Sequence, residues 1–161
     1  MYRLIGGALI IGGVVAVCRG YESYLRRGQR QAEGFLGYLC AKRRSIANYK
    51  SKRPITLPDG EGKTLLEMGF LERLRLGESS EDAYRSTEGS SCLSPEARHI
   101  LEKYFSRCGR EYMEGELKLL DGALSALGEL VEKTGKELPK RIRLIYTLGL
   151  AAGMGMLLLI I

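Results

Sequence analysis

The sequence predicts an all-α protein, in which a cytoplasmic antiparallel helical bundle lies between an N-terminal and a C-terminal transmembrane helix. The last eighteen residues, Leu144 to Ile161, carry no charge, and a helix of that length spans about 27 Å, near the thickness of a bilayer's hydrocarbon core. A second apolar stretch, Leu4 to Cys18, opens the chain. Between these stretches no sustained period-two pattern with β-branched enrichment predicts a strand.

Positive charges flank both apolar stretches on the side that faces the middle of the chain: Arg19, Arg26, Arg27 and Arg30 after the first, and Lys136, Lys140, Arg141 and Arg143 before the second. The positive-inside rule therefore places the middle in the cytoplasm and both chain ends on the outer side. We predict three parts, which are a transmembrane helix at residues 1–18, a bundle domain at 19–143 and a transmembrane helix at 144–161.

The first apolar stretch also resembles the core of a signal peptide. However, no small-x-small cleavage site follows Cys18, and the run continues directly into Arg19-Gly20-Tyr21. Cleavage would leave a secreted helical protein that is anchored by its tail, with the middle domain on the outer face. This secreted form is the alternative to the two-span reading.

The middle begins with one long amphipathic helix. From Glu22 to Tyr49 the apolar residues recur mostly at helical spacing, and the helix is expected to stop near Arg53-Pro54. Gly28, Gly34 and Gly37 each weaken such a helix by about 1 kcal/mol relative to alanine. Its stability must therefore come mainly from tertiary packing.

Three shorter helices are expected next, each with a recognisable end. The first covers residues 63–76 and closes on Gly77, a residue suited to a left-handed cap. The second can start at Ser79 and Ser80, which Glu81 and Asp82 follow. The third is capped by Ser94, with Pro95 at its first position.

The last helix of the middle carries apolar residues spaced alternately by four and three: Met113, Leu117, Leu120, Leu124, Leu127 and Val131. This alternation is typical of a heptad seam. Because the seam is shorter than three heptads, a core face in an antiparallel bundle is favoured over an intermolecular coiled coil.

The composition argues against several classes of function. The net charge of +6 is modest, and much of the basic excess lies beside the two apolar stretches, so a nucleic-acid partner is not expected. The four cysteines form no CxxC pair and His99 is the only histidine, so no metal site and no cofactor are expected.

One string resembles part of a nucleotide-binding loop. Gly60-Glu61-Gly62-Lys63-Thr64 matches the end of such a loop, but Leu57 stands where the first glycine belongs and no strand precedes the loop, so nucleotide binding is not expected.

A general acid or base needs a pocket that perturbs its pKa, and a small filled bundle offers no obvious one. We therefore predict no catalytic residues, and a membrane-bound enzyme with an acidic site or Cys108 is the less favoured alternative.

Two groups of residues are candidates for contacts. Gly149 and Gly153 form a GxxxG pair in the last apolar stretch, and small residues let membrane helices approach closely. The basic cluster Lys42, Arg43 and Arg44 is a candidate partner-binding surface, although a solvated helix face carries the same kind of residues.

The arrangement as a whole resembles the stage III sporulation protein AB family. The resemblance rests on a short N-terminal span, an arginine-rich helix leading into Pro54-Ile55-Thr56-Leu57-Pro58, a helical middle, and the terminal segment Arg143-Leu144-Ile145-Tyr146-Thr147-Leu148-Gly149-Leu150. Pro139 and the glycine content of the first helix depart from the family's pattern.

The resemblance implies a function. The family is similar to the cytoplasmic domain of the F protein of type II secretion systems, which contacts an assembly ATPase. The stage III sporulation protein AB family belongs to a channel complex in the mother-cell membrane around the forespore, alongside a predicted secretion-type ATPase, stage III sporulation protein AA. We therefore expect a noncatalytic membrane platform that docks this ATPase and other channel components.

Overall fold

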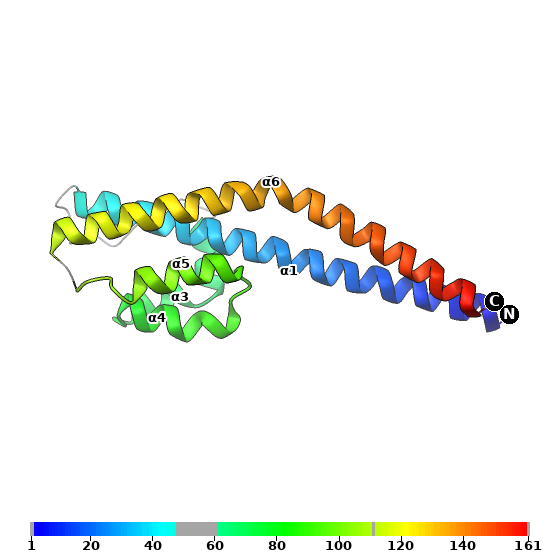
Figure 1. The fold of residues 1–161 in the computed structure, drawn as a ribbon. Coiled ribbons are helices and arrows are strands. Elements are labelled where there is room, and N and C mark those ends of the chain that lie inside the picture. The colour runs from blue at the N-terminus through cyan, green and yellow to red at the C-terminus, as the bar shows by residue number, and fades with distance from the viewer. Residues whose placement is uncertain (1, 48–60, 111, 161) are drawn as a thin grey trace. The chain divides into compact units, whose positions relative to one another are not determined.

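The computed structural model describes residues 2–47, 61–110 and 112–160. In this part of the chain the regular elements are helices and no strand occurs, which confirms the all-α class. In chain order the elements are α1 (Tyr2–Ala47), α2 (Glu61–Glu67), α3 (Phe70–Arg75), α4 (Ser80–Thr87), the 3₁₀ helix η1 (Glu88–Ser90), α5 (Pro95–Phe105) and α6 (Met113–Ile160) (Figure 1).

The chain divides into two compact units. One contains Met1–Arg26 and Thr134–Ile161, and the other contains Arg27–Lys133. The long helices α1 and α6 each contribute to both units. The division at residues 18 and 143, which marks the expected edges of a membrane, stays a prediction.

Both long helices are more continuous than the sequence pattern suggested. The first apolar stretch and the amphipathic helix expected from Glu22 onward form a single helix, α1, with no break at Arg19-Gly20. Its expected end near Arg53-Pro54 lies outside the described residues. In the same way α6 runs from the predicted seam to the apolar end of the chain, and it continues through Pro139.

The single helix expected over residues 63–76 is wrong, because the chain forms two helices there. Gly69 adopts a left-handed backbone with φ of 82°, so α2 ends and α3 begins around it. A left-handed residue cannot continue a right-handed helix, and glycine adopts this conformation without a steric penalty. Gly77 has φ of 90°, as expected of a left-handed cap after α3.

The Ser94 cap is confirmed, and of the serine pair before α4 it is Ser79 that forms the cap. The side chain of Ser79 accepts a hydrogen bond from the backbone N–H of Asp82 at 3.1 Å, and α4 follows. The side chain of Ser94 accepts one from the N–H of Ala97 at 3.2 Å, with Pro95 in the first turn of α5. Each cap satisfies a backbone donor that the first helical turn leaves without a partner.

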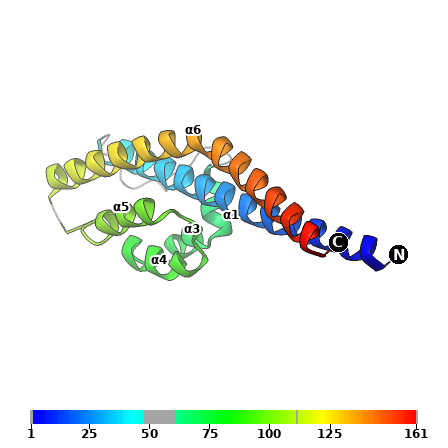
Figure 2. The same cartoon turned by 45° about the vertical axis from the view of Figure 1, so that its right-hand side comes forward.

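An aromatic cluster forms the core of the second unit. The Phe35 and Phe70 rings pack in a T-shaped arrangement with 5.2 Å between centroids, and Tyr84 stacks on Phe105 at 4.7 Å. Within this unit α3, α4 and α5 lie on one side of the stretches of α1 and α6 (Figures 1 and 2). Side chains from all these helices therefore share one apolar core.

The predicted seam of α6 contributes to this core. Leu120 and Leu127 are fully buried, and Leu124 and Val131 pack against the buried cluster. Met113, at the start of the helix, is 42% exposed. The central part of the seam is thus a core face within the unit.

In the described residues, α6 is the one helix whose length and apolar composition suit a membrane span. Its most apolar stretch is almost entirely exposed, unlike the core helix of a water-soluble protein. Large exposed apolar side chains continue along it, at Leu144, Leu148, Met154 and Leu158. The N-terminal transmembrane helix stays a prediction.

Candidate functional site

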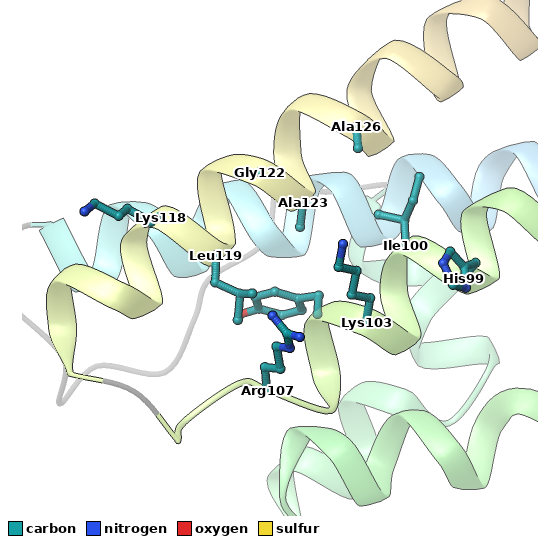
Figure 3. A pocket seen from close by; sticks show the side chains of 10 residues that line it. His99, Ile100, Lys103, Arg107, Lys118, Leu119, Gly122, Ala123 and Ala126 are labelled. Atoms are coloured by element: carbon teal, nitrogen blue, oxygen red, sulfur yellow. The ribbon is translucent and has the colours of Figure 1, made fainter.

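A groove of about 410 Å³ lies between α5 and the first half of α6 (Figure 3). Both helices belong to the second unit. Ten residues line it: His99, Ile100, Lys103, Tyr104 and Arg107 from α5 and the turn that follows it, and Lys118, Leu119, Gly122, Ala123 and Ala126 from α6.

The floor of the groove is formed by apolar and small residues. Ile100 and Leu119 are half-buried, and Tyr104 is buried. On α6 the exposed positions Gly122 and Ala126 stand four residues apart, on one face of the helix. A Cβ at Gly122 would meet no atom within 4 Å, so the groove is open where α6 lacks side chains.

The rim of the groove is basic. His99, Lys103 and Arg107 follow one another at intervals of four residues, which places them along one side of α5 and its end. Lys103 extends from α5 toward α6 (Figure 3). Lys118 stands on α6, and no carboxylate among the described residues lines the groove.

A buried polar cluster lies beside the groove, around Tyr104. The Lys42 ammonium donates to the Cys108 sulfur at 2.6 Å and lies 3.3 Å from a Glu116 carboxylate oxygen. The other oxygen of Glu116 accepts the N–H of Gly109 at 2.9 Å. Lys42 also lies over the Tyr104 ring, 5.4 Å from its centroid. These contacts join α1, α5 and α6.

The cluster holds its charged groups in their ionised forms. Burial alone would raise the pKa of Glu116, but the Gly109 N–H, Cys108 and Lys42 outweigh it, and the pKa lies below its usual value. Burial alone would lower the pKa of Lys42, but its contacts with Cys108, Tyr38 and Glu116 outweigh it, and the pKa lies above its usual value. Glu116 and Lys42 thus form a charged pair at neutral pH.

In the described ranges no group of three His, Cys, Asp or Glu side chains could hold a metal ion. The contacts of the polar cluster link α1, α5 and α6.

Comparison with known proteins identifies the family. The model of the stage III sporulation protein AB family matches residues 66–161. The chain belongs to the stage III sporulation protein AB family. A search of curated proteins and a search of solved structures gave no match.

Membership in the stage III sporulation protein AB family gives the chain a role in sporulation. The family is not a known enzyme family. The matched segment contains both walls of the groove and the apolar end of α6.

The three residues of the predicted basic cluster, Lys42, Arg43 and Arg44, lie in three different surroundings. Lys42 turns into the buried cluster, and its side chain is 17% exposed. Arg43 forms an ion pair with Asp121 of α6, and Arg44 is exposed. A partner-binding role for the three residues stays a prediction.

The two predicted glycines of the last apolar stretch lie against α1 within the first unit. A Cβ at Gly149 would come within 2.6 Å of the Cys18 sulfur, and one at Gly153 within 3.5 Å of Val14. The Cys18 thiol lies 3.8 Å from the carbonyl oxygen of Ile145. Their role in packing within a membrane stays a prediction.

Sequence reasoning missed the groove. Two signals for it are present in the sequence, namely the four-residue spacing of His99, Lys103 and Arg107 and the small pair Gly122 and Ala126. These two signals indicate a groove only when α5 and α6 are known to be neighbours.

Proposed function

We propose that this chain is a noncatalytic membrane platform of a sporulation channel. It docks a cytoplasmic secretion-type ATPase, stage III sporulation protein AA, together with other channel components, at the mother-cell membrane around the forespore. The observation that carries the proposal is the family match over residues 66–161. That segment joins an exposed apolar helix end to a well-packed helical core.

In this proposal the chain crosses the membrane twice. The apolar end of α6 forms one span, and the first eighteen residues form the other. Exposed apolar side chains on α1, including Leu9 at 72% and Val17 at 73%, support a lipid-facing surface. The close approach of Gly149 and Gly153 to Val14 supports packing of the two spans on each other.

The cytoplasmic part is an antiparallel helical bundle formed by the second unit. The unbroken helices α1 and α6 each pass from this unit into the first one. A partner that binds the bundle is therefore connected to the membrane by two continuous helices. Such a connection suits a platform that anchors a motor or receives force from it.

Topology is the first test. The native cysteines are replaced by serine, and single cysteines are placed at exposed Arg75 on α3 and at each chain end. Each variant is expressed in vegetative bacterial cells, where the outer side of the membrane is accessible from the medium, and an impermeant maleimide is applied to intact and then to permeabilised cells. We expect labelling at both ends in intact cells and labelling at position 75 only after permeabilisation.

Labelling at position 75 in intact cells overturns the proposal, because a cytoplasmic ATPase could not reach a bundle on the outer side. The expected topology is followed by a binding measurement with the purified ATPase. The full chain is held in nanodiscs for this measurement. Binding above that of empty nanodiscs is the expected result.

A further inference from the structure

We infer that the groove between α5 and α6 binds an acidic amphipathic helix of a partner protein. The inference deepens the proposed function and rests on it, since it names the surface by which the bundle receives a partner. It is carried by the charge and the shape of the groove.

The cations at the rim lack partners within the described part of the chain. Lys103, Arg107 and Lys118 are exposed and form no ion pair there. Elsewhere in the second unit several arginines are matched with carboxylates, as in Arg43 with Asp121, Arg73 with Glu78, and Arg85 and Arg110 with Glu81. The groove thus carries uncompensated positive charge, which attracts an acidic partner and orients it.

The floor selects an amphipathic partner over a merely acidic one. Beside the cations lie Ile100, Leu119 and the small residues Gly122 and Ala126. An apolar strip beside a basic edge is complementary to a helix with apolar residues on one face and carboxylates along the side that meets the cations. Apolar side chains of the guest would cover the floor, while its carboxylates reach Lys103 and Arg107.

The length of the groove suits a short helical segment. From Lys118 to Ala126 the axis of α6 advances by about 12 Å, at roughly 1.5 Å per residue, which corresponds to about two turns of a guest helix. Two turns bring two or three apolar side chains onto one face. The guest motif is therefore an apolar residue repeated at intervals of three or four, with glutamate or aspartate between the repeats.

Gly122 allows the groove to be filled without disturbing the fold. An added Cβ there meets no atom within 4 Å, and Gly122 lies within a helix, so a residue with a side chain improves helix propensity. In Gly122→Leu the side chain occupies the space of the guest's apolar residues. The double variant Lys103→Glu with Arg107→Glu reverses the charge of one edge at exposed positions.

The test uses the full chain in nanodiscs of zwitterionic lipid. The probe is a fluorescein-labelled helical peptide with leucines at intervals of three and four and glutamates between them. A matched peptide carries lysines in place of the glutamates. Fluorescence anisotropy measures the affinity of each peptide for the wild-type chain, for the two groove variants and for Arg75→Glu, a charge reversal on α3 outside the groove.

We expect saturable binding of the acidic peptide to the wild-type chain and to Arg75→Glu. Each groove variant should lower the affinity about tenfold, a loss of about 1.4 kcal/mol. Equal binding of the lysine peptide, unchanged binding by Gly122→Leu, or the absence of saturable binding to the wild-type chain overturns the inference. So does displacement of the peptide when phosphatidylglycerol replaces part of the nanodisc lipid, because the groove is then a lipid site.

A second arm separates this inference from the proposed function. The ATPase is titrated onto the same nanodiscs. If the ATPase does not bind the wild-type chain while the acidic peptide does, the proposed function is overturned and the inference about the groove is supported. If the ATPase binds the wild-type chain while the acidic peptide binds no better than the lysine peptide, the inference about the groove is overturned and the proposed function is supported.

Discussion

Lys42 of α1 and Glu116 of α6 form an ion pair in which Nζ lies 3.3 Å from Oε1, and their side chains are only 17% and 9% exposed. The pair joins the two long helices within the second unit. Cys108 lies within 3.3 Å of the carboxylate, and the Gly109 N–H donates to it at 2.9 Å. A buried pair of this kind is stable only because its members satisfy each other and their neighbours.

Removing one member of this pair should be costly. Glu116→Ala leaves the Lys42 ammonium buried without its counter-charge, and we expect the free energy of unfolding to fall by about 3 kcal/mol. The double variant Lys42→Met with Glu116→Leu removes both charges and should lose less than Glu116→Ala. Chemical denaturation of the full chain in detergent, followed by circular dichroism, measures the change.

The matched control is Asp121→Ala, which breaks the exposed pair of α1 and α6 formed with Arg43. Both side chains of that pair are about half exposed, at 52% and 54%. We expect a change below about 1 kcal/mol, because solvent screens an exposed pair. Equal losses of unfolding free energy in Glu116→Ala and Asp121→Ala would show that the buried pair stabilises the fold no more than the exposed pair does.

The same cluster sets a pH dependence. The pKa of Glu116 is lowered in the folded chain, so the unfolded chain binds more protons below the carboxyl's ordinary value of 4.5. The stabilisation is therefore complete above that value and is lost as pH falls through the folded pKa. The pKa of Lys42 is raised, so its contribution is complete below its ordinary value of 10.5 and is lost as pH rises further.

We expect the unfolding temperature to be highest between these two limits and to fall on either side. Glu116→Gln should flatten the acid side of the profile, because the titrating group is gone. The alkaline side should change less, because Cys108 and Tyr38 also raise the pKa of Lys42. Thermal unfolding across this pH range measures both limbs. An acid limb that is as steep in Glu116→Gln as in the wild-type chain would assign it to other groups.

Local signals in the sequence were enough to predict the fold class and several helix ends. Ser79 and Ser94 cap their helices through hydrogen bonds within three residues, and Gly77 adopts its left-handed conformation at a helix end. The break at Gly69 was missed because apolar residues recur at helical spacing on both sides of it. A glycine inside such a pattern is compatible with a continuous helix as well as with a turn.

The groove and the buried cluster depend on contacts between distant segments. Lys42 and Glu116 are separated by most of the second unit, and nothing near either residue marks the other as its partner. The sequence pattern therefore predicts that Lys42 belongs to a basic surface with its neighbours Arg43 and Arg44. Periodicity shows which face of a helix is apolar, but it does not show which helix covers that face.

Gly28 gives a test of this distinction between local and distant effects. By propensity alone Gly28→Ala should stabilise α1 by about 1 kcal/mol. However, an added Cβ would collide with the backbone carbonyl of Cys92, which cannot move as a flexible side chain can. We therefore expect Gly28→Ala to lower the free energy of unfolding by about 1 to 3 kcal/mol.

Gly122→Ala is the control for Gly28→Ala, because its Cβ meets no atom within 4 Å. It should raise the free energy of unfolding by up to about 1 kcal/mol. Chemical denaturation under identical conditions compares the two variants. A stabilised Gly28→Ala would mean that α1 and Cys92 do not approach each other closely.

The final prediction concerns the contact of α1 with α6 in the first unit. Gly149→Leu places a side chain against the Cys18 sulfur and Val14, whereas Gly155→Leu meets no atom within 4 Å of its Cβ. Cysteines at positions 7 and 157 report on the contact, since a Cβ at Gly7 would lie 2.8 Å from Leu157. Disulfide formation between them is measured in membranes by mass spectrometry, with and without each leucine.

We expect Gly149→Leu to lower the yield of the disulfide between positions 7 and 157 several-fold, because small residues are what allow the two backbones to approach. Gly155→Leu adds the same apolar side chain to the same helix and should leave the yield unchanged. Equal yields in the two variants would contradict close packing at Gly149. A loss in both would point to an effect of leucine on α6 itself and not on its contact with α1.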